Sequence, residues 1–193
     1  MKTLYMMRHG ETLFNKRRKI QGWCDSPLTE LGIRQAKGAK KYFQDQGITF
    51  DHVYSSPSER CVDTLNIITD MPYKTYKGLK EMNFGTFEGE SEDLNPPTEM
   101  YETFFTTYGG ESRDDVKKRI YKTCLDIMNE ENETVLIVSH GGACSHFLGQ
   151  VIDNDLYQQI KSQGFKNCSI LKYTFEDGKF TFVDIMRPLP IEE

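Results

Sequence analysis

The sequence predicts an α/β fold, a single three-layer domain in which helices flank a mostly parallel central sheet. Strand and helix signals alternate along the chain, which is typical of this architecture. Residues 3–7 and 134–138 are short apolar runs with the β-branched or aromatic content of buried parallel strands. The 193 residues are 37% hydrophobic, and no repeat or linker divides them, so we expect one domain over residues 1–193.

The first strand, residues 3–7, is expected to lead through a loop into a long helix. Apolar side chains recur along one side of the segment from about Thr29 to Gln46, which predicts an amphipathic helix. Gly47 follows directly, and glycine commonly stands just past a helix end. Residues 52–54 then predict a short second strand.

The start of the next helix carries a local signal of its own. Ser56 can cap a helix, Pro57 fits its first position, and Glu59 completes a capping box. Arg60 would then lie on the first turn, close to the carboxyl edge of the second strand.

The second half of the chain predicts two more helices, at residues 114–129 and 142–151, on either side of the 134–138 strand. Residues 169–175 and 179–185 form a closing hairpin, because Glu176-Asp177-Gly178 supplies its turn. Between these elements and the first half, residues 90–110 are irregular and rich in aromatic side chains. We expect a short cap segment over the site, at about residues 82–110.

Composition excludes several classes of protein. The net charge of −5 argues against a nucleic-acid partner, for which a basic face is expected. The basic run Lys16 to Lys19 is interpreted as a solvated turn, with a positive rim that attracts an anionic substrate as the alternative. The five cysteines are scattered and never spaced as Cys-x-x-Cys, so neither a disulfide framework nor a metal site is indicated.

The same features predict where the protein works. Reduced cysteines fit a cytoplasmic protein, and the N-terminal residues lack the apolar stretch of a signal peptide. No run approaches the about 20 apolar residues of a membrane span, so we expect no membrane partner. The oligomeric state is left open.

Two histidine segments are the main functional signal. His9, within Arg8 to Thr12, follows the first strand, and His140, within Ser139 to Gly142, follows the 134–138 strand. Ligands of open α/β sheets bind beyond the carboxyl ends of such strands. Each histidine precedes a glycine, which allows close approach of the backbone to a ligand. Both imidazoles are therefore expected at one sheet edge.

This set of residues suits transfer of a phosphoryl group through a phosphohistidine. Neutral imidazole is a nucleophile with a pKa near neutrality, and nearby arginines favour its neutral form. Arginine also matches phosphate oxygens bidentately. No metal is needed to activate the attack, and no cofactor is expected. Two histidines, Arg8, Arg60 and a possible acid supply the required groups.

At this point the chain resembles the histidine phosphatase superfamily, which includes cofactor-dependent phosphoglycerate mutases and many small phosphatases. The resemblance covers nearly the whole chain. Its motifs match Arg8 to Thr12 with Asn15, Gln21 to Thr29, Ser55 to Arg60, Leu79 to Gly89, Gly109 to Ser112, and Ser139 to Gly142. It implies a phosphoglycerate mutase-like fold.

The resemblance also implies roles for single residues. His9 would be the nucleophile, with Arg8, Arg60 and His140 around the phosphoryl oxygens. Glu81 would protonate the leaving oxygen and then, as a carboxylate, help water attack the phosphohistidine. The binding pocket would further include Asn15, Gln21, Gly22 and Gly141. His52 and His146 are interpreted as structural.

Two enzyme activities and one non-enzymatic function remain open. The family's arginine shortly after the second histidine motif is absent, where Ala143 to His146 stands, and the longer insertions typical of phosphoglycerate mutases are missing. We therefore favour a phosphomonoesterase acting on a small phosphorylated metabolite, with cofactor-dependent phosphoglycerate mutase as the alternative. A phosphate-binding module without turnover is the third hypothesis, although such a module needs no nucleophile or acid.

Overall fold

A six-stranded sheet forms the centre of the computed structural model, which describes residues 1–192 and all of their side chains except those of residues 98 and 99. The strand order is β3-β2-β4-β1-β5-β6. The first four strands are parallel, and β5 and β6 are antiparallel. The strands are β1 (Lys2–Arg8), β2 (His52–Ser55), β3 (Tyr73–Thr75), β4 (Thr134–Ser139), β5 (Ile170–Glu176) and β6 (Lys179–Met186).

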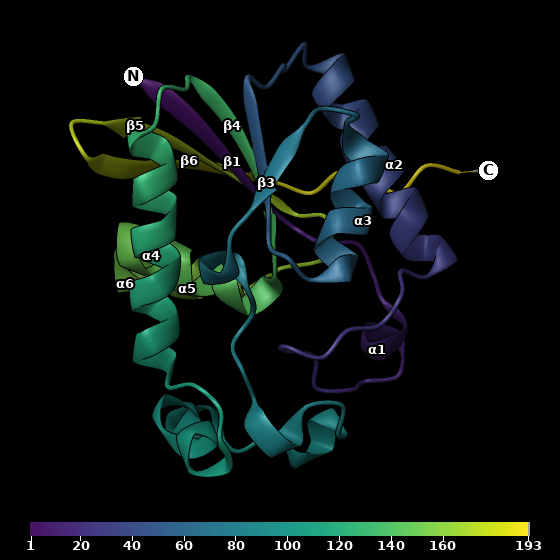
Figure 1. Ribbon diagram of the computed structural model, residues 1–193, viewed down its shortest axis with the longest axis vertical. Coiled ribbons are helices and arrows are strands. Elements are labelled where there is room, and N and C mark those ends of the chain that lie inside the picture. Colours follow the sequence, from purple (N-terminus) through teal and green to yellow (C-terminus); the bar gives the residue numbers. More distant parts are fainter. Residues whose placement is uncertain (193) are drawn as a thin grey trace.

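Helices cover both faces of this sheet, so the predicted α/β class with a mostly parallel sheet is confirmed (Figure 1). One face packs against α2 (Glu30–Asp45) and α3 (Glu59–Ile68), and the other against α4 (Arg113–Asn129), α5 (Gly141–Val151) and α6 (Asn154–Ser162). None of these helices, within the described part of the chain, is long and apolar enough to span a membrane.

Alternation along the central strands builds the two halves of the core. Leu4 and Met6 of β1 pack toward α4 and α5, whereas Tyr5 and Met7 pack toward α2 and α3. All four are at most 5% exposed, because successive side chains of a strand point to opposite faces and both faces are covered. This packing holds the carboxyl ends of β1 and β4 rigidly side by side.

The predicted start of α3 is wrong by two residues. Its N-cap is Ser58, which makes no side-chain cap hydrogen bond, and Glu59 is its first residue. Ser56 instead continues the sheet, since its N–H donates to Val138 O at 2.9 Å, and its hydroxyl contacts His140. A residue tied to β4 cannot also begin a helix.

Among the strands and α-helices, three elements were not predicted. α1 (Leu13–Lys16) is a single turn within the expected loop, β3 has three exposed residues and therefore no apolar pattern, and α6 begins shortly after α5. Asp153 caps α6 by accepting a hydrogen bond from Leu156 N at 2.9 Å. The other predicted elements agree with the structure within about two residues, including the hairpin of β5 and β6 and the left-handed Gly47 after α2.

The aromatic segment forms a small cluster of its own beyond the carboxyl ends of the strands. It consists of short 3-10 helices, η2 (Gly85–Phe87), η3 (Glu92–Leu94), η4 (Thr98–Glu102) and η5 (Phe104–Tyr108), which follow η1 (Lys77–Leu79). Phe105 is fully buried among Phe84, Phe87, Tyr101 and Phe104. In Figure 1 this segment lies at the bottom, with α1 (Leu13–Lys16) nearby.

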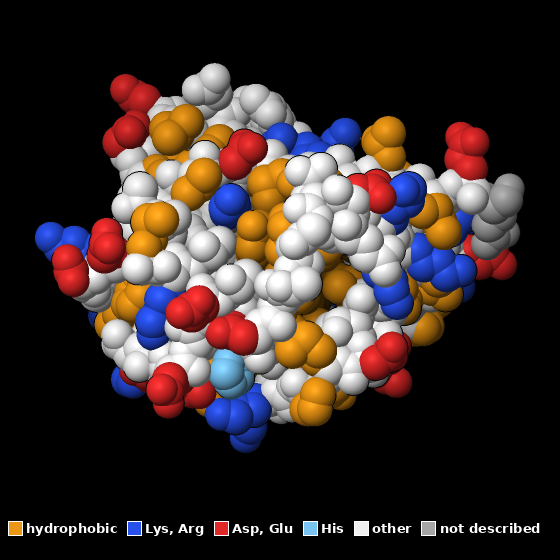
Figure 2. All heavy atoms as spheres, turned by 90° about the horizontal axis from the view of Figure 1, so that it is seen from above, with side chains coloured by type: hydrophobic (Ala, Val, Ile, Leu, Met, Phe, Trp, Pro, Cys, Tyr) orange, Lys and Arg blue, Asp and Glu red, His pale blue; other side chains and the backbone are white. Residues whose placement is uncertain are grey.

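The opposite end of the molecule carries charged side chains of both signs (Figure 2). Figure 2 looks onto the face at the top of Figure 1, where acidic and basic side chains are interspersed. The cavity described next lies at the other end, between the strand ends and the aromatic segment.

Candidate active site

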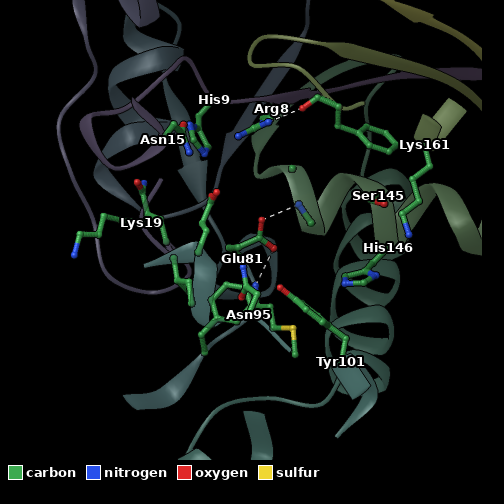
Figure 3. Close-up of a pocket in the computed structure, with 18 residues that line it drawn as sticks. Arg8, His9, Asn15, Lys19, Glu81, Asn95, Tyr101, Ser145, His146 and Lys161 are labelled. Atoms are coloured by element: carbon green, nitrogen blue, oxygen red, sulfur yellow. Dashed lines mark hydrogen bonds between the residues drawn. The ribbon is translucent and has the colours of Figure 1, made fainter. Parts of the chain in front are cut away.

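A cavity of about 450 Å³ lies beyond the carboxyl ends of β1 and β4. The parallel pairing places Arg8 opposite Ser139, so the residues that follow both strands meet here. The rings of His9 and His140 are 5.4 Å apart between centroids. Figure 3 shows Arg8 and His9 on one side of the cavity, His146 and Lys161 on another, and Glu81 between them.

His9 presents one nitrogen for chemistry. Its Nδ1 lies 2.7 Å from Gly10 O, and because a carbonyl only accepts, Nδ1 carries the proton and Nε2 the lone pair. The side chain is 4% exposed. Burial and, after it, the charges of Arg60 and Arg8 hold the pKa of His9 well below its ordinary value. His9 is therefore a neutral, oriented imidazole at neutral pH.

Arg60 lies against the Nε2 side of His9, on the first turn of α3. Its Nε–H points to His9 Nε2 at 3.3 Å. The guanidinium is buried, and it forms an ion pair with Asp25 at 2.9 Å. Gly22 O accepts from Nη2 at 2.8 Å, and Cys24 O accepts from Nη1 at 2.9 Å. The loop of residues 22–25 thus fixes the cation beside the histidine.

His140 contacts the other end of the Arg60 guanidinium. Arg60 Nη2 donates to its Nδ1 at 2.8 Å, so Nε2 carries the proton and donates to Ser56 Oγ, also at 2.8 Å. Burial, followed by the charges of Arg60 and other cations, keeps the pKa of His140 well below its ordinary value. His140 caps the N-terminus of α5 and is fixed in one tautomer.

Arg8 is the second cation at the strand edge. Its Nη1 donates to Phe165 O at 2.5 Å, while its buried Nε–H has no hydrogen-bond partner. A Cβ at Gly141 would come within 3.2 Å of that Nε, so glycine allows the N-terminus of α5 to approach the guanidinium. Helix N–H groups at such an end have no partner within the helix, and they suit an anion.

Glu81 reaches the cavity from the loop after η1. Met82 N donates to its Oε1 at 2.9 Å, and Gly142 N donates to its Oε2 at 2.8 Å. The side chain is 8% exposed, and its carboxyl group is therefore held in one position. A Cβ at residue 142 would lie 2.5 Å from Glu81 Oε1, which explains the second glycine of the pair that follows His140.

Of the remaining predicted residues, Asn15 and Gln21 line the cavity, and Gly22 does not. In the orientation that satisfies its neighbours, the Gln21 amide oxygen accepts from Arg60 Nε at 2.9 Å. The N–H of Gly22 is taken by Glu88 Oε2 at 3.0 Å, and its carbonyl holds Arg60. Gly22 therefore lies among the supports of Arg60 and outside the lining of the cavity.

Sequence reasoning missed several lining residues, among them His146, which it interprets as structural, and Lys161. Lys19 of the basic run and Tyr101 of the expected cap segment also line the cavity, which agrees with the alternative interpretation of that run as a positive rim. One signal was available for His146, since it follows Gly142 by four residues on α5 and so lies on the same helix face. Within residues 1–192, no group of three or more metal-ligating side chains is arranged to hold a metal ion.

Comparison with known proteins agrees with this geometry. The model of the histidine phosphatase superfamily (branch 1) matches residues 4–187. The chain is 34% identical to the probable phosphoglycerate mutase GpmB of Yersinia pestis (strain Pestoides F), over 92% of this chain and 87% of that protein. YhfR of Bacillus stearothermophilus superimposes with a TM-score of 0.82 at 29% identity, over 95% of this chain and 96% of that one.

A further solved structure is a phosphoserine phosphatase of Entamoeba histolytica in complex with 3-phosphoglyceric acid. It superimposes with a TM-score of 0.79 at 29% identity, and the match covers 96% of each chain. Similar proteins thus carry both phosphatase and mutase names. The two solved structures share the fold with this chain over nearly their whole length.

Proposed function

This protein belongs to branch 1 of the histidine phosphatase superfamily, and we propose that it is a phosphomonoesterase that acts on a small phosphorylated metabolite through a phosphohistidine at His9. The observation that carries the proposal is the state of His9. Its imidazole is neutral, its unprotonated nitrogen is Nε2, and two guanidinium groups flank it. An imidazole so prepared can attack phosphorus at neutral pH.

In the first step, His9 Nε2 forms a bond to phosphorus while the ester P–O bond breaks. Charge on the phosphoryl oxygens would be stabilised by fixed cations, which is the main catalytic contribution in such transfers. Arg8 has a buried donor without a partner, and Arg60 points Nε–H at the attacking atom. The position of Arg8 supports a role in holding the oxygens, with Gly141 beside it in the cavity wall. Arg60 and His140 do not line the cavity, and they support the reaction by orienting His9 and supplying positive charge next to it.

Glu81 would supply the proton that the leaving oxygen needs. It lines the same cavity, and two backbone N–H groups orient its carboxyl. In the second step the carboxylate accepts a proton from water as the water oxygen attacks phosphorus and the N–P bond breaks. Inorganic phosphate leaves, and His9 and Glu81 return to their starting states.

Water is the favoured acceptor because the chain lacks the longer insertions of phosphoglycerate mutases. A mutase must shield the phosphohistidine from water and return the group to a reoriented acid, which requires extra cover. The short 3-10 helices between Glu90 and Gly110 offer little of it. Mutase activity is the second candidate, because the 34% identical relative is named a probable phosphoglycerate mutase.

The deciding experiment measures phosphate release from a panel of phosphomonoesters in the presence of a metal chelator. 3-Phosphoglycerate isomerisation with added 2,3-bisphosphoglycerate is assayed in parallel. We expect release by the wild type, and loss of it in His9→Ala with an unchanged unfolding midpoint. Mass spectrometry of protein denatured at high pH should detect one phosphoryl group on His9.

Each other outcome assigns a different function. Isomerisation with little release identifies a mutase, and binding of phosphate without either reaction identifies a binding module. Equal release by wild type and His9→Ala would remove the proposed mechanism. Glu81→Gln should reduce turnover by about 10²-fold or more for alkyl phosphates, whose leaving groups need a proton, and much less for p-nitrophenyl phosphate.

A further inference from the structure

The cavity at His9 continues into a second chamber of about 660 Å³. The residues that line the chamber come from the aromatic segment and from the helices α4, α5 and α6. Residues that line both spaces are Asn95, Tyr101, Gly142, Ser145, His146 and Lys161. A ligand with its phosphoryl group at His9 can therefore extend into the chamber without leaving the protein surface.

The chamber is positively charged in a protein of net charge −5. Its lining includes Arg113, Lys117, Lys161 and His146, and no aspartate or glutamate among its described lining residues. Arg113 lies 4.0 Å from Glu102, so its charge is partly balanced by a neighbouring carboxylate. The two lysines, one from α4 and one from α6, approach the space from separate helices.

These two lysines differ from others on the same helices. Lys118 and Lys122 of α4 form ion pairs with the aspartates one turn before and one turn after them. Within the described part of the chain, no such ion pair involves Lys117 or Lys161. The Lys161 ammonium lies 5.9 Å from the centre of the Tyr157 ring, at the chamber wall.

His146 lies among these charges in the lining of the chamber. Its imidazole is partly buried, and burial, followed by the charges of Arg113, Lys117 and other cations, lowers its pKa to about 4. A cluster in which cations outnumber the neighbouring carboxylates attracts anions where solvent is partly excluded. Ser145 and Tyr157 add hydroxyl groups, hydrogen-bonded to each other at 2.8 Å.

We propose that this chamber is a second anion subsite, and that the substrate is a phosphomonoester carrying a second anionic group, a carboxylate or a phosphate. Lys117 and Lys161 bind this group while the scissile phosphoryl group lies at His9. The proposal rests on the proposed function for the position of the scissile group. The second anion would balance the charge of two lysines that form no ion pair with a carboxylate in the described part of the chain.

The test compares matched pairs of phosphomonoesters. Glycerol 3-phosphate and 3-phosphoglycerate differ by a carboxylate, and fructose 6-phosphate and fructose 1,6-bisphosphate differ by a phosphate. We expect the wild type to favour, in kcat/KM, the member that carries the second anionic group in at least one pair. Lys117→Gln and Lys161→Gln should each lower that preference by about tenfold, the effect of losing one charge-assisted contact. The sensitive pair identifies the chemistry of the second group.

Lys118→Gln is the matched control. It removes the same charge from the neighbouring position of α4, where the side chain is 73% exposed and pairs with Asp114. We expect Lys118→Gln to show the same ratio of kcat/KM values within each pair as the wild type, because a charge that does not contact the ligand changes this ratio little. Equal losses in Lys117→Gln and Lys118→Gln, or no loss in either Lys117→Gln or Lys161→Gln, would overturn the subsite. Unfolding midpoints confirm that each variant is folded.

A binding arm separates the subsite from catalysis. Calorimetric titration of His9→Ala with 3-phosphoglycerate and with fructose 1,6-bisphosphate measures affinity without turnover. Weaker binding of either ligand, by about tenfold, in His9→Ala/Lys117→Gln supports the subsite even if the wild type hydrolyses nothing. In that case only the phosphatase proposal fails. Binding that does not depend on Lys117 overturns the subsite whether or not phosphate is released.

Discussion

Replacing Glu88 by glutamine tests how the site is held together, because this carboxylate joins two loops. Its Oε2 accepts hydrogen bonds from Gly22 N and Cys24 N, both at 3.0 Å. Its Oε1 accepts from Trp23 N at 2.7 Å and from Phe84 N at 3.0 Å. The loop so anchored supplies the two carbonyl groups that bind Arg60. Glu88 therefore positions Arg60 from a distance.

The size of the effect follows from these contacts. A glutamine amide has one oxygen, so two of the four backbone donors would face an NH2 group and lose their acceptor. Hydrogen bonds to a charged group are worth about 1.5–3 kcal/mol each. Because Glu88 is partly exposed, water replaces some of the loss, and we expect about 2–4 kcal/mol. That is a large part of a typical free energy of unfolding of about 5–15 kcal/mol.

Urea unfolding and phosphate release measure the two consequences in the same preparations. Glu90→Gln is the control, because it makes the same change at an exposed position nearby. We expect Glu88→Gln to lose about 2–4 kcal/mol relative to this control, and to lose at least tenfold in kcat/KM through the misplaced Arg60. Equal stability of the two variants would refute the reasoning.

The pH dependence of that difference provides a second check. Burial opposes ionisation of Glu88, but hydrogen bonds from Cys24, Phe84 and Trp23 outweigh it and lower the pKa below the ordinary 4.5. A carboxyl whose pKa is lowered by folding stabilises the protein above its unfolded pKa, and this contribution is lost as pH falls through the folded pKa. The difference in the free energy of unfolding between wild type and Glu88→Gln should therefore become smaller below about pH 4.5.

Three further changes test other contacts of the site. Gly142→Ala puts a methyl group 2.5 Å from Glu81 Oε1, so turnover of alkyl phosphates should fall about 10²-fold. In a Glu81→Gln background, Gly142→Ala should lower turnover little further. Fully additive losses of turnover would contradict an effect that acts through the contact between residue 142 and Glu81. Asp25→Asn weakens the ion pair with buried Arg60, and should raise the inhibition constant of inorganic phosphate about tenfold; an unchanged constant would show that the pair does not position Arg60. Because the pKa of His146 is lowered to about 4, the unfolded chain takes up a proton below pH 6.5 that the folded protein resists. The free energy of unfolding of the wild type should therefore fall between pH 7 and pH 5, with about 2 kcal/mol of that decrease due to His146, and His146→Asn should lack this part. An equal decrease in both proteins, measured by urea unfolding, would contradict this.

Local patterns were sufficient for most of the architecture. Apolar runs that alternate with amphipathic segments predicted β1, β2, β4, α2 and the closing hairpin, because burial against a sheet or helix imposes those periods. The pairing of Arg8 with Ser139 follows from two parallel strands that end in the same direction. Short exposed elements such as β3 escaped prediction, since nothing in three exposed residues distinguishes a strand from a loop.

The sequence by itself determined the α/β class and brought His9 and His140 to one sheet edge, because strand ends and the residues that follow them are encoded locally. Only the tertiary structure decided where Ser56 binds, since its hydroxyl serves a histidine 84 positions away rather than a helix start. It also decided the charge of the second chamber. Lys117 and Lys161 look like ordinary surface lysines in the sequence, and only the packing of α4, α5 and α6 places both in the lining of one chamber.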